Sequence, residues 1–166
     1  MYTIISGTNR EDSFTEKIAK EYLQILKEKN IEAAFLSLKG LNVLERDASF
    51  LKTEEEILIP AQKIIFIVPE YNGSYPGVLK AMIDNSDIKK DWWWKKALLT
   101  GVSAGRAGNL RGMDHLTGTL QYMKMIVHPN KLPISIVDTL FDKNGVINHT
   151  PTSQAIKGQL EEFINF

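Results

Sequence analysis

The stretch from Lys63 to Val68, with the sequence KIIFIV, constrains the fold more than any other part of this chain. After its lysine, the stretch is an unbroken run of apolar, mostly β-branched residues that leaves no polar face on a strand. Such a strand is buried on both sides, which is typical of the interior of a parallel sheet covered by helices. The run therefore predicts an α/β protein with this segment inside its sheet.

Strand-like apolar runs alternate with helical patterns along the rest of the chain. Apolar residues return at helical spacing from Phe14 to Lys29, and Ser13 with Glu16 forms a capping-box pattern at the start of that helix. Repeated strand–helix units predict a parallel sheet with helices on both faces, in one domain over residues 1–166. The other predicted strands are Tyr2–Ile5, Ile31–Leu38, Lys96–Ser103 and one within Lys131–Val137; the other predicted helices start near Thr53, at Pro76-Gly77, at Leu110 and at Thr150-Pro151, with Thr150 as the cap.

Composition excludes several classes of protein. The 20 basic and 20 acidic residues balance, which argues against a nucleic-acid-binding protein. The chain has no cysteine, so disulfides, thiolate catalysis and cysteine-bound zinc are excluded, and its three histidines show no metal-site spacing. The apolar start is too short for a signal peptide, and no run approaches the ~20 residues of a membrane span. A cytoplasmic protein with no membrane partner and no metal is expected.

The loop after the first strand, from Gly7 to Thr15, suits an anion. Three hydroxyls and an arginine surround the start of a helix, where free N–H groups and the helix dipole favour negative charge. The loop is neither a Walker loop nor the G-x-G-x-x-G dinucleotide turn. Serine and threonine also cap helices that bind nothing, so this pattern alone is equally compatible with a plain capped turn.

Two later loops follow the third and fourth predicted strands. The segment Pro69–Gly77 offers an aromatic face and several backbone amides, which suit a planar heterocycle, although its tyrosines could merely pack. The segment Gly101–Asn109 is rich in small residues, which allow a ligand close to the backbone or simply form a flexible connection. In parallel α/β sheets, ligands bind at the carboxyl ends of the strands, where all three loops are expected.

The three loops together resemble those of the NADPH-dependent FMN reductase family of flavodoxin-like proteins. The resemblance is carried by GTNREDSFT (7–15), PEYNGSYPGVLKAMID (69–84) and SAGRAGN (103–109), in that order, and it runs through nearly the whole chain. The second motif is the most specific. The family usually has serine at position 8 and often asparagine at position 15, where this chain has Thr8 and Thr15, and its glycine-rich third loop is shortened here.

The resemblance implies a three-layer sandwich with a five-stranded parallel sheet in the order 2-1-3-4-5. It implies FMN as cofactor, NADPH or NADH as hydride donor, and a small acceptor such as a quinone, azo compound, metal oxyanion or free flavin. No side chain is assigned a catalytic proton, because the cofactor carries the chemistry. The implied cofactor-binding residues are Thr8, Arg10, Ser13, Phe14 and Thr15 in the first loop, Pro69, Glu70, Tyr71, Asn72 and Gly73 in the second, and Ser103, Ala104, Gly105 and Arg106 in the third.

Two other functions remain open at this point: a flavodoxin-type electron carrier, and a flavin-binding module without turnover. Carriers are typically acidic so that they dock basic partners, whereas this chain is neutral. Arg106 could meet the extra phosphate of NADPH or form a surface pair.

Two features point to packing and assembly. The run Trp92-Trp93-Trp94 is expected to pack at the base of the fourth strand or in a subunit contact, with an aromatic wall for an electron acceptor as the alternative. The family's usual dimer surfaces correspond to residues 78–86 and 110–125, which predicts a homodimer or homotetramer. The apolar residues that support this surface are Val78, Leu79, Met82, Ile83, Leu116, Leu120 and Met123.

Overall fold

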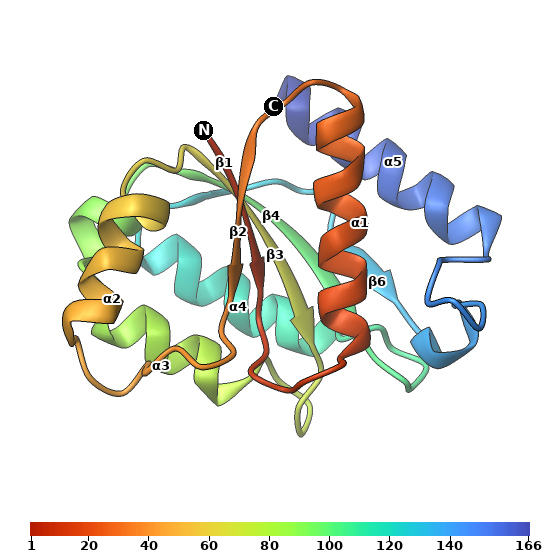
Figure 1. The fold of residues 1–166 in the computed structure, drawn as a ribbon, viewed down its shortest axis with the longest axis horizontal. Helices are drawn as coiled ribbons and strands as arrows, with labels where there is room; N and C mark the ends of the chain where they lie inside the picture. Colours follow the sequence, from red (N-terminus) through yellow and green to blue (C-terminus); the bar gives the residue numbers. More distant parts are fainter.

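The computed structural model describes residues 1–166 as a three-layer sandwich, with helices on both faces of one sheet (Figure 1). The sheet is parallel, in the order β2-β1-β3-β4-β5, as expected. Its strands are β1 (Tyr2–Ser6), β2 (Ala33–Ser37), β3 (Lys63–Pro69), β4 (Lys96–Val102), β5 (Ile126–Val127) and β6 (Leu132–Ile134). The helices are α1 (Phe14–Glu28), α2 (Ala48–Thr53), η1 (Glu54–Leu58), α3 (Gly77–Asn85), η2 (Ile88–Trp92), α4 (Leu110–Tyr122), η3 (Val137–Thr139) and α5 (Thr150–Asn165).

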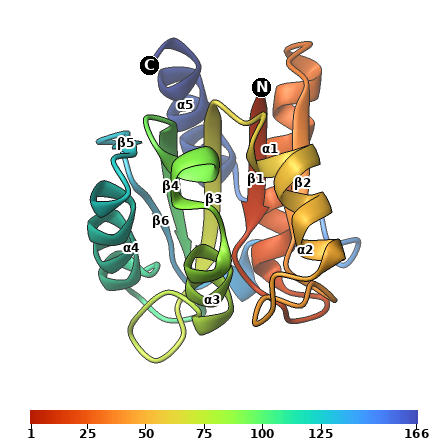
Figure 2. The ribbon, with the colours of Figure 1, turned by 90° about the vertical axis from the view of Figure 1, so that its left-hand side faces the viewer.

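Strand β3 divides the apolar core into two layers. Ile64, Phe66 and Val68 point into the layer beneath α2, α3 and α4, while Ile65 and Ile67 point into the layer beneath α1 and α5. All five side chains are fully buried. Figure 2 shows α1 and α5 behind the sheet and α2, α3 and α4 in front of it. The prediction of a central strand without a polar face is therefore confirmed.

The fifth place in the sheet is shared by two short strands. β5 pairs with the start of β4 at Lys96 and Ala97, and β6 pairs with its end at Thr100–Val102. The sequence predicted a single strand within Lys131–Val137, and β6 lies in that range. The segment between them contains Pro129, which lacks the N–H that a continuous ladder needs.

Two helix starts differ from the predictions. The helix expected to begin near Thr53 starts at Ala48, because the Asp47 side chain accepts a hydrogen bond from the N–H of Phe50. At α5 the cap is His149 rather than Thr150, since the imidazole Nδ1 accepts the Thr152 N–H at 3.3 Å. A histidine cap is uncommon, so the preference rules pointed to the neighbouring threonine.

The three tryptophans separate into different environments. Trp92 is fully buried beside Phe66, and its indole N–H donates to the Ser86 hydroxyl at 2.6 Å. Trp93 lies under the Lys124 ammonium, 3.8 Å from the ring centroid, and Trp94 is 67% exposed. Trp92 therefore packs at the base of β4 as expected, while Trp94 faces solvent.

The apolar residues of α3 and α4 serve the core of their own domain. Leu79, Met82, Ile83, Leu116, Leu120 and Met123 are all buried beneath the sheet, and Val78 packs against them. These residues therefore serve the core and give no support to a subunit contact, so the homodimer or homotetramer stays a prediction. None of the helices is long and apolar enough to cross a membrane.

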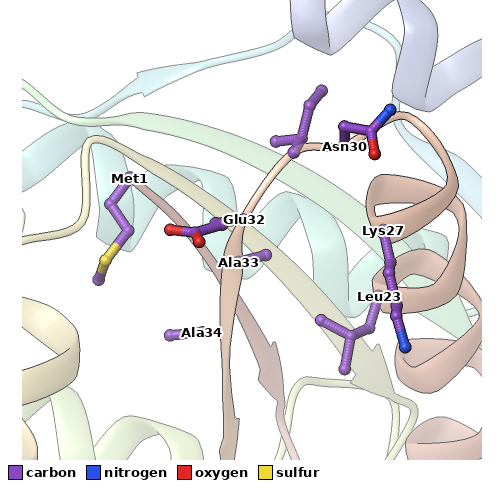
Figure 3. A pocket seen from close by; sticks show the side chains of 8 residues that line it. Met1, Leu23, Lys27, Asn30, Glu32, Ala33 and Ala34 are labelled. Atoms are coloured by element: carbon purple, nitrogen blue, oxygen red, sulfur yellow. The ribbon is translucent and has the colours of Figure 1, made fainter.

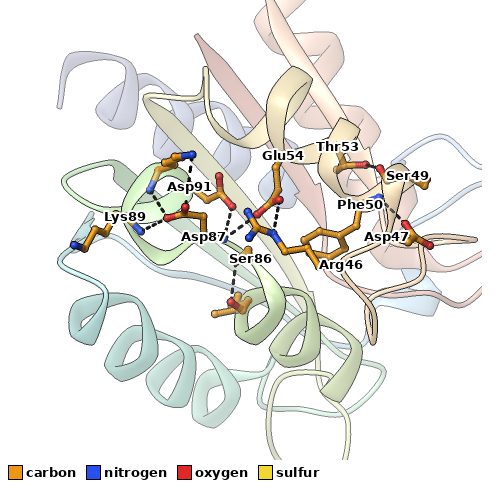
Figure 4. Close-up of polar contacts among 12 residues, drawn as sticks. Arg46, Asp47, Ser49, Phe50, Thr53, Glu54, Ser86, Asp87, Lys89 and Asp91 are labelled. Carbon is orange, nitrogen blue, oxygen red and sulfur yellow. Dashed lines mark hydrogen bonds and ion pairs between the residues drawn. The ribbon is translucent and has the colours of Figure 1, made fainter.

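A buried carboxyl pair joins η1 to η2 at the amino end of β4 (Figure 4). The backbone N–H of Asp87 donates to Glu54 Oε1 at 2.8 Å and to Asp91 Oδ2 at 3.0 Å. Arg46 Nε donates to the other Glu54 oxygen at 2.8 Å.

Burial, with a hydrogen bond to the Glu54 carboxylate, raises the pKa of Asp91 to about 7. Burial alone would raise the pKa of Glu54, but Arg46, Asp91 and the Asp87 N–H hold it below its ordinary value. Of the two carboxyl groups, Asp91 is therefore the one that takes up a proton first as pH falls.

This pair predicts a pH-dependent stability. Because the folded state raises the pKa of Asp91, the stability from its protonated form is complete below about pH 4 and is lost as pH rises through about 7. We expect the free energy of unfolding to fall by about 2 kcal/mol between pH 5.5 and 7.5. Asp91→Asn should flatten this slope in denaturant titrations, since an amide can donate to Glu54 at every pH.

The control is Asp84→Asn, which alters an exposed carboxylate paired with Lys80. It should leave the slope unchanged. Lys95, whose pKa burial lowers to about 8, adds stability only at higher pH and does not obscure the window. An Asp91→Asn protein with the wild-type slope would contradict this account.

Candidate functional site

The carboxyl ends of β1, β3 and β4 open onto one cavity of about 270 Å³. Its walls come from three loops that are far apart in the sequence, as expected for a parallel sheet. The cavity is lined by Arg10, Glu11, Ser13, Phe14, Thr15, Pro69, Glu70, Tyr71, Val102, Ser103, Ala104 and Val137. Most of the predicted cofactor-binding residues therefore lie around a single cavity.

The first loop delivers the start of α1 to this cavity. The Gly7 N–H donates to the Ile67 carbonyl at 2.8 Å, and a Cβ at Gly7 would lie 3.1 Å from the same oxygen. Ser13 caps α1 by accepting the Glu16 N–H at 3.1 Å, as predicted. The N–H groups of Phe14 and Thr15 make no hydrogen bond within the protein. They are donors available to an anion at a helix N-terminus.

The first and second loops are joined through Thr8 and Tyr71. The two hydroxyl oxygens lie 2.6 Å apart, and Thr8 Oγ1 also accepts the Arg10 N–H at 3.1 Å. The Arg10 guanidinium stacks over the Tyr71 ring, 4.0 Å from its centroid. Thr8 is almost fully buried, so it supports the loop from beneath, while Arg10 and Tyr71 present their side chains to the cavity.

The second loop ends in a two-residue hairpin turn. Tyr71 and Ser74 exchange backbone hydrogen bonds of 2.9 and 3.1 Å across Asn72 and Gly73. Both central residues have positive φ, 52° and 75°, as a type I′ turn requires, and Asn-Gly is the preferred pair for that turn. The turn fixes Tyr71 beside the cavity but carries Asn72 and Gly73 to its rim.

The third loop is a tightly bonded turn rather than a flexible connection. The Ser103 hydroxyl donates to the Gly105 carbonyl and accepts the Gly108 N–H, both at 3.0 Å. A Cβ at Gly101 would lie 2.1 Å from the Gly108 carbonyl oxygen, so this glycine allows the loop to fold back on itself. Of the glycines in this loop, only Gly105 has open space where a ligand could approach.

Three arginines lie at or near the site and form no ion pair, although two carboxylates, Glu11 and Glu70, also line the cavity. Arg46 is the only arginine that pairs with an acidic side chain, in the distant carboxyl cluster. Arg10 borders the cavity, Arg106 is exposed in the third loop, and Arg111 extends from α4 to Gly73. These guanidinium groups remain available for an anionic ligand.

Several predicted residues do not line the cavity, and others were missed. Thr8 lies beneath it, while Asn72, Gly73, Gly105 and Arg106 lie outside its wall. Glu11 and Val102 are neighbours of predicted residues, so the motifs gave a signal for them. Val137 comes from η3, which the backbone bond from its N–H to the Ser103 carbonyl brings to the site. Nothing local in the sequence marks it.

Two cavities that are more than twice as large do not have the features of a reaction site. One, of about 680 Å³, lies beside the amino ends of β1 and β2 and contains Met1, Lys27 and Glu32 (Figure 3). It lies at the end of the sheet opposite to the helix N-terminus and the hairpin turn. The other, of about 750 Å³, lies between α3 and α4. Neither is reached by the three loops.

Comparison with known proteins identifies a family for this chain. The model of the family described as NADPH-dependent FMN reductase matches residues 2–138. The chain belongs to this family. An NAD(P)H-dependent FMN reductase of Pseudomonas aeruginosa is 31% identical to this reductase over 95% of this chain and 89% of its own length.

Other similarities are more distant. A 2-hydroxy-1,4-benzoquinone reductase of a Burkholderia species is 24% identical, over 96% of this chain and 92% of its own. The solved flavoenzyme NAD(P)H:(acceptor) oxidoreductase FerB from Paracoccus denitrificans has a TM-score of 0.82 and 24% identity, with 99% of this chain and 94% of that one covered. The FerB likeness shows a shared fold.

The family makes the protein an oxidoreductase with FMN as cofactor and NAD(P)H as electron donor. The residues present fit FMN. Free N–H groups at the start of α1 suit its single terminal phosphate, and the aromatic side chain of Tyr71 with the apolar Pro69 and Val102 suits a planar ring.

Ser13, the N-cap of α1, allows the part of the site that suits the FMN phosphate to be tested. Ser13→Ala should lower the free energy of unfolding by about 1 kcal/mol, because the Glu16 N–H loses its acceptor. FMN affinity, measured by calorimetry, should fall as well. Asp47→Ala, which removes the cap of α2, is the matched control and should lower stability without affecting FMN. Unchanged FMN affinity in Ser13→Ala would leave the serine with a capping role only.

Proposed function

We propose that this reductase passes electrons from NADPH or NADH, through FMN held by the three loops, to a quinone. The observation that carries the proposal is the convergence of the free α1 amides, Tyr71 and the Ser103 loop on one cavity. A relative named for reduction of a hydroxybenzoquinone favours a quinone over an azo compound, a metal oxyanion or free flavin as the acceptor.

Each loop has a separate task in this proposal. Arg10, Ser13, Thr15 and the α1 amides bind the phosphate, with Thr8 holding Arg10 and Tyr71 in place. Pro69, Glu70 and Tyr71 form one wall of the ring site, and Ser103, Ala104 and Gly105 form the other. Asn72 and Gly73 shape the turn that holds Tyr71. Bound FMN supplies hydride acceptance and donation, chemistry that no side chain of this protein provides.

The protein's contribution to the reaction is binding and orientation. The donor's nicotinamide must lie against the flavin at roughly 3–3.5 Å for transfer, so the loops must leave one side of the ring site open. Exposed Arg106 is suited to the additional phosphate that distinguishes NADPH from NADH, because its guanidinium has no carboxylate partner.

The test is anaerobic stopped-flow bleaching of the bound flavin by NADPH and by NADH. Both donors should bleach the wild-type flavoprotein without any protein partner. In Arg106→Ala the half-saturating concentration of NADPH should rise several-fold, since one charge-assisted contact is lost. The value for NADH should stay the same, which makes NADH the internal control.

Three results would contradict different parts of the proposed function. If neither nucleotide bleaches bound FMN but a reduced partner protein does, the chain is an electron carrier and the reductase proposal fails. A colourless protein that binds no FMN would contradict both readings. Equal effects of Arg106→Ala on the two donors would remove the assignment of that arginine.

We also propose that the protein is a homodimer or homotetramer joined through the outer faces of α3 and α4. The cavity between these helices is lined by the exposed residues Ile88 and Tyr122, and Tyr122 is 83% exposed. Aromatic residues are enriched at protein interfaces relative to the rest of the surface. Light scattering at micromolar concentration should give a dimer or tetramer, and Tyr122→Glu should shift it towards the monomer. A wild-type monomer under these conditions would contradict the proposal.

A further inference from the structure

The side chain of Asn109 joins the two loops that form the proposed ring site. Asn109 is fully buried, immediately before the first residue of α4. Its amide Nδ2 donates to the carbonyl oxygens of Val68 at 3.0 Å and Pro69 at 2.9 Å. Those carbonyls belong to the last two residues of β3, at the point where the chain turns towards Tyr71.

Asn109 is also anchored to its own loop. Its backbone carbonyl accepts the Met113 N–H at 3.0 Å, which starts the hydrogen bonding of α4. The preceding residue, Gly108, donates its N–H to Ser103 Oγ at 3.0 Å. A continuous path therefore runs from Pro69 on one side of the cavity, through Asn109 and Gly108, to Ser103 on the other.

The requirements of the helix start do not explain an asparagine here. Its side chain makes no capping hydrogen bond, and its φ of 63° is one that glycine adopts without a side chain. Its Oδ1 atom is buried and accepts no hydrogen bond from the protein, which costs free energy. Glycine would satisfy the backbone and remove that cost. What asparagine adds is the pair of amide donors to β3.

We infer that Asn109 is a positioning residue of the flavin site, which sets the separation between the Pro69–Tyr71 wall and the Ser103–Gly105 wall. The inference rests on the proposed function, because those walls are assigned to the flavin ring. Asn109 does not reach the phosphate end, since its contacts are to β3, α4 and its own loop. Its loss should therefore weaken binding of the ring and leave binding of the phosphate intact.

The experiment compares Asn109→Gly with wild type in titrations with FMN and with riboflavin, which lacks the phosphate. Glycine accepts the positive φ, so the variant loses the two donors without new backbone strain. The dissociation constants for both ligands should rise by the same factor, on the order of tenfold. The ratio between the two ligands should stay at its wild-type value. The visible absorption spectrum of the bound flavin should shift, because its protein surroundings change.

The matched control is Tyr22→Phe, which removes a buried hydroxyl bonded to Thr100 Oγ1 at 2.7 Å and to Gln159 Oε1 at 2.5 Å. This network lies between α1, β4 and α5 and does not include the loops. Tyr22→Phe should lower the melting temperature without changing either dissociation constant or the spectrum. If Asn109→Gly does not fold, Asn109→Ser replaces it, since the shorter side chain cannot bridge to both carbonyls.

The results distinguish a failure of the positioning role of Asn109 from a failure of the proposed function. Asn109→Gly with wild-type dissociation constants and spectrum would overturn the positioning role while the proposed function stands. A rise for FMN alone, with riboflavin unchanged, would also overturn it, because the effect would then lie at the phosphate. A wild-type protein that binds neither ligand would contradict the proposed function itself.

Discussion

The parallel pairing of β3 with β1 on one side and β4 on the other is the constraint on which the site depends. Ser6 lies opposite Ile67, and Val68 opposite Gly101, so the three strands end at nearly the same level. The loops that leave them therefore emerge side by side, although they start at residues 7, 70 and 103. The backbone hydrogen bonds of the two parallel ladders hold this arrangement.

Each loop is then held by hydrogen bonds within the protein. The Thr8–Tyr71 contact joins the first two loops, the Asn72-Gly73 turn closes the second, and Ser103 closes the third. A site that is formed in advance loses less conformational entropy when a ligand binds. The unpaired arginines and the free amides of α1 add a positive potential, which suits a phosphate-bearing cofactor and a phosphate-bearing donor.

Much of this arrangement could be predicted from the sequence because it rests on local rules. The apolar run of β3, the Ser13 cap and the Asn-Gly turn each determine their own conformation. The parts that could not be predicted depend on contacts between distant residues. Val137 is brought to the cavity by the backbone bonds of Ile136 and Val137 to the third loop, and the raised pKa of Asp91 depends on its burial beside Glu54 of another helix. The apolar residues of α3 and α4 were assigned to a subunit contact because sequence alone does not reveal how much of a helix its own sheet covers.

The central claim is that flavin binds at the carboxyl ends of β1, β3 and β4, although the molecule has larger cavities elsewhere. An amide-resolved NMR titration of the protein with FMN tests this most directly. The largest shifts should fall on the N–H groups of Phe14 and Thr15, and on those of Tyr71 and Ser103, because these border the cavity. Shifts confined to the groove around Lys27 and Glu32, or to the cavity between α3 and α4, would contradict the account.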